Sequence, residues 1–147
     1  MKLNLVIFED KKIPEISKPV EKFDNRLASI VKTMFDTIYK YNGIGLAAIQ
    51  IGVPQCIVVA DVDNNKIVAI NPKITWQSSE VEEMEEGNLS LPNIKVRVSR
   101  PLKIELHYQN LAGKEKILLA DGLLARCLQH EVEQLEGKTI LDHISNN

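Results

Sequence analysis

The apolar and polar positions of this chain predict a helix near the N-terminus, a series of short strands and a second helix near the C-terminus. Asp24 is a typical N-cap residue, and after it apolar residues recur at helical spacing until Asn42 and Gly43, a typical C-cap pair. The residues of this apolar stripe are Leu27, Ile30, Val31, Met34, Phe35 and Ile38. Because such a stripe normally faces a protein core, we interpret it as packing surface.

The middle of the chain has the pattern of strands. Short runs rich in β-branched residues, bounded by turn residues, indicate strands at 56–62, 67–70, 73–76, 95–98, 103–108 and 116–120. Asn71-Pro72 is expected to interrupt the strands on either side of it, and residues 110–113 are expected to form a hairpin turn. The acidic residues 80–86 are interpreted as a solvated strand and loop, and the apolar run 3–8 as an edge strand.

The second helix is predicted over residues 122–135. Asp121 is its expected cap and Gly137 its end, and it carries the stretch QHEVEQLEG at 129–137. In an HExxH motif, two histidines four residues apart on one helix face bind one metal, and the glutamate between them is the general base. Here His130 and Glu131 are present, but Gln134 stands at the second ligand position. A lone His-Glu pair is usually no more than a polar helix surface, so this fragment needs support from elsewhere.

Composition and charge limit the classes of protein to consider. The chain has 147 residues, 44% of them hydrophobic and 26% charged, which is typical of one soluble globular domain spanning residues 1–147. Its net charge of −2 provides no general attraction to nucleic acid or to an anionic membrane. No apolar run is long enough to span a bilayer, and two cysteines do not form a disulfide framework. We therefore expect a cytoplasmic protein that binds neither membrane nor nucleic acid.

Three segments of the chain share their pattern with one known family. Residues 43–50 read GIGLAAIQ, residues 86–90 read EGNLS, and residues 129–137 read QHEVEQLEG. The first segment alone would suggest only a tight connection between a helix and a strand. Together, in this order and at this spacing, the three resemble the G-x-G-L-A-A-x-Q, E-G-C-L-S and Q-H-E-x-D-H-L-x-G motifs of the peptide deformylase family, metallohydrolases that remove the formyl group from N-formylmethionyl peptides. The resemblance extends over essentially the whole chain.

The resemblance implies a fold and a set of site residues. The fold would be α+β, with antiparallel β-sheets around a central C-terminal helix that carries the HExxQ motif, plus the N-terminal amphipathic helix. Family members bind Fe²⁺, Zn²⁺ or Ni²⁺ through one cysteine and two histidines. The resemblance assigns His130 as a ligand, Glu131 as the general base, and Gln50 with the Leu89 N–H as stabilisers of the oxyanion. It also implies substrate-binding positions, namely Gly43, Ile44, Gly45, Leu46, Glu86, Gly87, Leu123 and Cys127.

Two departures from the family pattern concern the metal. Asn88 replaces the cysteine ligand and Gln134 replaces the second histidine. An amide cannot deprotonate and has only a weak carbonyl oxygen to offer, whereas thiolate and imidazole are strong ligands of iron and zinc. We therefore expect no tightly bound transition metal. An alternative is a rearranged metal site formed by Cys127, His130 and Glu133, which lie near one face of the helix. The simpler interpretation, which we favour, is that Cys127 is a packed cysteine and Glu133 a solvated glutamate.

Three functions remain open at this point. The first is an enzyme, either a deformylase or a divergent hydrolase with weak or altered activity. The second is a metal-free module that binds methionyl or formyl-methionyl peptides. The third is a pseudoenzyme whose site is filled by an Asn88–His130–Gln134 hydrogen-bond cluster. The expected partner is an N-terminal peptide or nascent chain, and the expected state is a monomer or weak dimer. Arg97 and Arg100 are candidates for substrate binding or for plain surface charge, and the histidines at positions 107 and 143 are expected to be structural or exposed.

Overall fold

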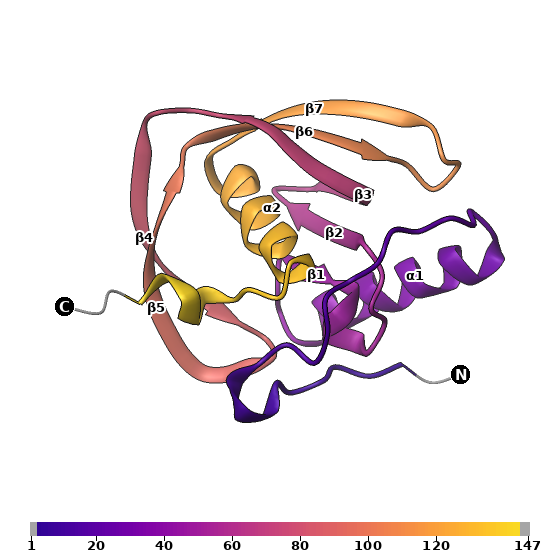
Figure 1. Cartoon of the computed structure of the whole chain (residues 1–147), viewed down its shortest axis with the longest axis horizontal. Coiled ribbons are helices and arrows are strands. Elements are labelled where there is room, and N and C mark those ends of the chain that lie inside the picture. Colours follow the sequence, from indigo (N-terminus) through magenta and orange to yellow (C-terminus); the bar gives the residue numbers. More distant parts are fainter. Residues whose placement is uncertain (1–2, 145–147) are drawn as a thin grey trace.

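The computed structural model describes residues 3–144 and places the second helix at the centre of the molecule (Figure 1). This helix, α2 (Gly122–Leu135), lies between a five-stranded and a two-stranded antiparallel sheet. The large sheet has the strand order β1-β2-β3-β6-β7, and β4 pairs with β5 in the small one. The strands are β1 (Gly45–Ala47), β2 (Ile57–Val62), β3 (Asn65–Gln77), β4 (Val81–Asn88), β5 (Leu91–Pro101), β6 (Lys103–Gln109) and β7 (Glu115–Asp121). The predicted α+β architecture is confirmed.

The N-terminal helix, α1 (Asn25–Lys40), forms as its apolar pattern predicts. The Asp24 side chain accepts a hydrogen bond from the Leu27 N–H at 3.0 Å, so Asp24 is a true N-cap. The apolar stripe of α1 is buried against β1 and β2, and Met34 and Ile38 within it have no exposed surface. The helix is therefore a packing element, as expected. The helix ends just before residues 41–45, which line the pocket described below.

Two helices cover opposite faces of the large sheet, and the central strand β2 separates two cores. Ile57 and Val59 pack in the core beneath α1, whereas Val58 and Ala60 pack in the core around α2. Side chains alternate between the two faces of a strand, and here both faces are covered. This is why residues 57–60 of β2 are a continuous apolar run, and its one polar residue, Asp61, stands near the end of the strand and bonds Tyr39.

Several local expectations differ from the structure. Asn71-Pro72 does not interrupt the sheet, because Asn71 adopts φ 52° within a bulge and β3 continues on both sides of it. The run at residues 3–8 is irregular and not a strand, and is held by hydrogen bonds such as that from the Val6 N–H to the Gln50 carbonyl. Asp121 precedes α2 but makes no side-chain cap hydrogen bond. The short strand β1 and the 3₁₀ helices η1 (Glu9–Lys11), η2 (Ala48–Ile51) and η3 (Ile140–His143) were not predicted.

The acidic residues 80–86 lie in and next to β4, which pairs with β5 in a long hairpin. Most of β4 is exposed, as expected, but its last residues turn inwards, and Glu86 and Asn88 are buried against α2. The hairpin thus carries the second motif to the helix that carries the third. Within the described residues, no helix is long and apolar enough to cross a membrane.

The central position of α2 can be tested with Leu128→Ala. Leu128 has no exposed surface, so the substitution should remove about 2–5 kcal/mol from the free energy of unfolding through lost burial and a residual cavity. Chemical denaturation would measure the loss. The matched control is Leu119→Ala on β7, where the side chain is 72% exposed and the expected change is under about 1 kcal/mol. An equal effect of the two substitutions would contradict this account of the core.

Candidate functional site

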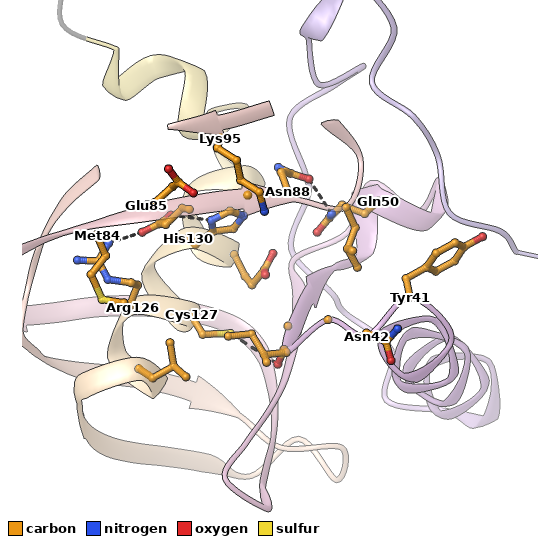
Figure 2. A pocket seen from close by; sticks show the side chains of 18 of the residues that line it. Tyr41, Asn42, Gln50, Met84, Glu85, Asn88, Lys95, Arg126, Cys127 and His130 are labelled. Carbon is orange, nitrogen blue, oxygen red and sulfur yellow. Dashed lines mark hydrogen bonds and ion pairs between the residues drawn. The ribbon is translucent and has the colours of Figure 1, made fainter. Parts of the chain in front are cut away.

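A pocket of about 570 Å³ opens between the segment that follows α1, the β4–β5 hairpin and α2 (Figure 2). The three sequence motifs meet there, although they are far apart in the chain. The predicted site residues that line the pocket are Gly43, Ile44, Gly45, Gln50, Glu86, Gly87, Asn88, Leu89, Leu123, Cys127, His130 and Glu131. Most of the predicted site residues therefore lie together in the wall of one pocket.

Two predicted positions do not line the pocket. Leu46 pairs with Val59 across β1 and β2 and packs in the core beneath α1, so its side chain points away from the site. The reason is strand alternation, because Gly45 and Leu46 are neighbours on one strand and face opposite sides. Gln134 is fully buried behind the pocket wall, where it contacts other site residues through hydrogen bonds.

The mouth of the pocket has an apolar rim, and only two of its four residues, Ile44 and Leu123, were predicted from the sequence motifs. Tyr41, Ile44, Met84 and Leu123 line it and remain 42%, 40%, 38% and 44% exposed. In Figure 2, Tyr41 lies on the α1 side of the pocket and Met84 on the opposite side. A usable signal for Met84 was its position two residues before Glu86 on β4, which places both on one face of the strand. An apolar rim of this kind suits an apolar ligand group.

Gly45 allows β1 to lie directly against α2. A Cβ at this position would overlap Cys127 Sγ and lie 2.9 Å from Glu131 Oε2, closer than real Cβ contacts. Glycine is therefore required here for space, not for an unusual backbone conformation. The close approach brings Cys127 and Glu131 to the pocket wall.

The side-chain amides of Gln50, Asn88 and Gln134 form a closed ring of hydrogen bonds. Gln50 Nε2 donates to Asn88 Oδ1 at 3.1 Å, Asn88 Nδ2 donates to Gln134 Oε1 at 3.1 Å, and Gln134 Nε2 donates to Gln50 Oε1 at 2.9 Å. Two backbone donors fix the direction of the ring. The Ala47 N–H points to Gln50 Oε1 and the Ser90 N–H to Asn88 Oδ1, so these two atoms must be oxygens.

The amide ring does not fit a transition metal. Only the oxygens of Asn88 and Gln134 could bind one, and Asn88 Oδ1 already accepts two hydrogen bonds while Gln134 Oε1 accepts one. Of the three ligand positions that the resemblance assigns, only that of His130 holds a strong metal ligand. Within residues 3–144, no group of three His, Cys, Asp or Glu side chains is arranged to hold a metal ion.

The predicted Asn88–His130–Gln134 cluster is correct in part. Asn88 and Gln134 are bonded, but His130 is outside the ring, and Gln50 and Glu131 take part instead. Glu131 Oε1 accepts from Gln134 Nε2 at 2.5 Å, while His130 Nδ1 lies 2.9 Å from Glu86 Oε1. The motif histidine is thus directed by the β4–β5 hairpin, and the motif glutamate by the ring.

Burial controls the charge of Glu131 and His130. Burial raises the pKa of Glu131 to about 7, although nearby His130 and the hydrogen bond from Gln134 lower it. Burial by itself would lower the pKa of His130, but the charges of Glu131 and Glu86 and the hydrogen bond to Glu86 outweigh it and raise the pKa. Burial thus favours the neutral form of Glu131, whereas the neighbouring carboxylates favour the charged form of His130.

Glu86 is the centre of a buried ion cluster that sequence reasoning missed. Arg100 donates to both of its carboxylate oxygens at 2.6 and 2.8 Å, and Arg126 donates to Oε2 at 2.5 Å. Burial alone would raise the pKa of Glu86, but the hydrogen bonds and charges of Arg100 and His130 hold it well below its ordinary value. Glu86 is therefore ionised and immobilised beside the pocket, as a support for His130 and the hairpin.

The cluster continues to the C-terminal segment and corrects two expectations. Arg100 is 4% exposed and bonds Glu133 at 2.7 Å, so it is neither surface charge nor a free substrate ligand. Glu133 is not a solvated glutamate, because it also lies 2.9 Å from His143 Nε2 on η3. Arg97 bonds Glu83 on the exposed side of the hairpin and has the surface role.

A rearranged metal site of Cys127, His130 and Glu133 does not form. Cys127 Sγ faces the Ile44 carbonyl at 3.7 Å, His130 bonds Glu86, and Glu133 bonds Arg100. Burial and the nearby carboxylates raise the pKa of the Cys127 thiol well above its ordinary value, so it stays protonated. Cys127 is a packed pocket-wall residue, as the simpler of the two alternatives predicted.

Comparison with known proteins places the chain in a family. Residues 2–147 match the family described as polypeptide deformylase. A peptide deformylase of Bartonella tribocorum is 44% identical over 149 residues, which cover 97% of this chain and 84% of that protein. The crystal structure of peptide deformylase from Thermotoga maritima superposes with a TM-score of 0.93 at 39% identity over 99% of both chains. A deformylase from Synechococcus elongatus in complex with actinonin gives 0.92 at 37% identity, over 99% of this chain and 80% of that one.

These matches identify the class of protein that the α+β fold and the helix-borne His-Glu motif define. The chain belongs to the peptide deformylase family, as the three sequence motifs indicated. The family is one of metal-dependent hydrolases, and the resemblance assigns Asn88 and Gln134 of the amide ring to two of the expected ligand positions.

Glu86→Gln should unfold the protein more easily. The substitution leaves Arg126 buried without a carboxylate partner and Arg100 with Glu133 alone, so the free energy of unfolding should fall by about 3–5 kcal/mol in chemical denaturation. Glu83→Gln is the matched control, because it breaks an exposed carboxylate–Arg97 pair on the same strand and should leave the denaturation midpoint unchanged. A small effect of Glu86→Gln would show that the cluster is not a structural centre.

Proposed function

We propose that this protein is a deformylase-family member that has lost metal-dependent hydrolysis and has kept the peptide pocket. The observation that supports the loss is the closed amide ring, which occupies the oxygens of Asn88 and Gln134 where a metal would need ligands. Family members act on N-terminal formylmethionyl peptides of nascent chains. The proposed ligand is accordingly an N-terminal peptide, met in the cytoplasm.

The chemistry of the reaction explains why the metal matters. A bound divalent metal lowers the pKa of water from 15.7 to about 7 and so produces a nucleophile at neutral pH. Glu131 is placed as a general base, but without that activation it has only ordinary water to deprotonate. Gln50 keeps the position of an oxyanion donor, yet both hydrogens of its Nε2 are donated, to Asn88 Oδ1 and to Ser90 Oγ. Both catalytic devices of the family are therefore impaired together.

The pocket itself favours a binding role. Its exposed rim of Tyr41, Ile44, Met84 and Leu123 has no partner among residues 3–144 that covers it, and an apolar side chain of a peptide would do so. This supports the second candidate function, a metal-free module for methionyl or formyl-methionyl peptides. A purely structural pseudoenzyme has no need of an open pocket of this size.

Purified protein should contain well below one metal per chain and should release formate from formyl-Met-Ala-Ser at least about a thousandfold more slowly than an active relative. Elemental analysis and a formate assay measure the two quantities. Incubation with Fe²⁺, Zn²⁺ or Ni²⁺ before the assay, and the deformylase of Thermotoga maritima prepared in parallel, are the controls. One tightly held metal per chain together with turnover near that of the control enzyme would refute the proposed loss.

Restoring the ligands should restore the site. The double substitution Asn88→Cys and Gln134→His replaces two amides by a thiolate and an imidazole and breaks the amide ring, so the variant should bind one Zn²⁺ or Fe²⁺ and gain formate release of about a hundredfold or more over the parent. The two single variants are matched controls and should bind weakly. A folded double variant that takes up no metal would show that these two positions do not explain the loss.

A further inference from the structure

We infer that the ring of Gln50, Asn88 and Gln134 is a cross-link that holds three distant segments of the fold together, and that it does so in place of a metal. This inference rests on the proposed function, because it requires that these amides are not metal ligands. It gives the ring a role that the loss of hydrolysis alone does not, since a site can lose its metal without gaining a substitute for it.

The ring joins one side chain from each of three elements. Gln50 lies on η2, Asn88 is the last residue of β4, and Gln134 lies in the last turn of α2. A metal bound at positions 88, 130 and 134 would tie the hairpin to α2 and would contribute to folding through that link. The ring makes the same link with three hydrogen bonds of 2.9–3.1 Å, and it includes η2 as well.

The hydrogen-bonding capacity of the ring is met mostly within the protein. Gln50 Oε1 accepts from Gln134 Nε2 and from the Ala47 N–H, and Gln50 Nε2 donates to Asn88 Oδ1 and Ser90 Oγ. Asn88 Oδ1 also accepts from the Ser90 N–H, and Gln134 Nε2 donates once more, to a carboxylate on its own helix. The Gln50, Asn88 and Gln134 side chains are 2%, 8% and 0% exposed. Loss of any one amide would therefore leave several buried polar groups without partners.

The three bonds of the ring depend on one another. If one amide were flipped, its nitrogen and oxygen would exchange places and meet like atoms on both neighbours. The Ala47 and Ser90 N–H groups exclude such a flip, because each of them needs an oxygen as its acceptor. Hydrogen bonds linked in this way strengthen one another, so the ring forms and breaks as a unit.

The N-terminal segment makes a parallel link between two of the same elements through the backbone. The Val6 N–H donates to the Gln50 carbonyl at 2.7 Å, and the Phe8 N–H donates to the Ser90 carbonyl at 2.9 Å. Phe8 is buried in the core around α2, which anchors the segment. The position of η2 relative to the hairpin is thus fixed by backbone and side-chain bonds, and none of them involves a metal.

The first test needs no substitution and so cannot fail through misfolding. The melting temperature of the parent protein should differ by less than about 1 °C between a buffer with chelator and one with an equivalent of Zn²⁺, because only a ligand that binds the folded state stabilises it. The Asn88→Cys, Gln134→His variant has lost the ring and gained ligands, so its melting temperature should be about 5 °C or more higher with Zn²⁺ than with chelator. A parent protein that Zn²⁺ stabilises by several degrees would overturn the inference.

The second test breaks the ring with side chains of similar size. Gln134→Met and Asn88→Leu should each lower the melting temperature by about 5 °C or more, through the buried groups that they leave unpaired. Because the ring acts as a unit, the two substitutions together should lower it by clearly less than the sum of their separate effects. Gln55→Met is the matched control, since the Gln55 amide accepts a bond from Arg26 at the surface, and it should change the melting temperature by less than about 1 °C.

Additive effects of the two ring substitutions, or a Gln134→Met variant as stable as the Gln55→Met control, would overturn the inference. Those results would leave the proposed loss of hydrolysis standing, because the metal content and formate release of the parent protein test that loss separately. Conversely, rapid formate release by the parent protein would refute the proposed loss and would leave the measured stabilities unchanged.

Discussion

The structure depends on the need to satisfy a buried polar helix face. Helix α2 lies at the centre of the fold, and among its buried residues are Arg126, Gln129, His130, Glu131 and Gln134. Buried polar groups without partners are costly, so each of these side chains needs a bond from a neighbouring element. The β4–β5 hairpin and the segment after α1 supply those bonds, and in doing so they meet at one pocket. Stability and site geometry therefore have the same origin.

The polar face of α2 is satisfied in two different ways. Towards the hairpin, an ion cluster around Glu86 pairs full charges and directs His130. Towards β1 and η2, neutral amides close a ring in which Gln50, Asn88 and Gln134 each donate and accept. A metal would need free electron pairs in the second region, but hydrogen bonds already use both of those on Asn88 Oδ1 and one of those on Gln134 Oε1. The ring is thus a self-sufficient replacement for a metal as the link between three segments, and it leaves a carboxylate and an imidazole open to the pocket.

Sequence patterns predicted the elements whose neighbours are local. The stripe after Asp24, the β-branched runs and the hairpin turn at residues 110–113 all appear in the structure because period and turn chemistry act over a few residues. The predictions that were wrong concern segments whose conformation depends on contacts with residues far away in the chain. Asn71-Pro72 continues a strand because its neighbour β6 accommodates a bulge, and the apolar run at residues 3–8 is irregular because it bonds to the Gln50 and Ser90 carbonyls instead of to a strand edge.

The sequence by itself determined the family, the motif residues and the chemical identity of the two replaced ligands, since these are properties of residue types and their spacing. Only the tertiary structure decided that Leu46 faces the core, that Arg100 and Glu133 are paired in the interior, and that Gln50 closes a ring with Asn88 and Gln134. The physical reason is the same in each case. Hydrogen-bond partners and strand faces depend on segments that are remote in the chain, and spacing along one segment contains no information about which atoms it will meet.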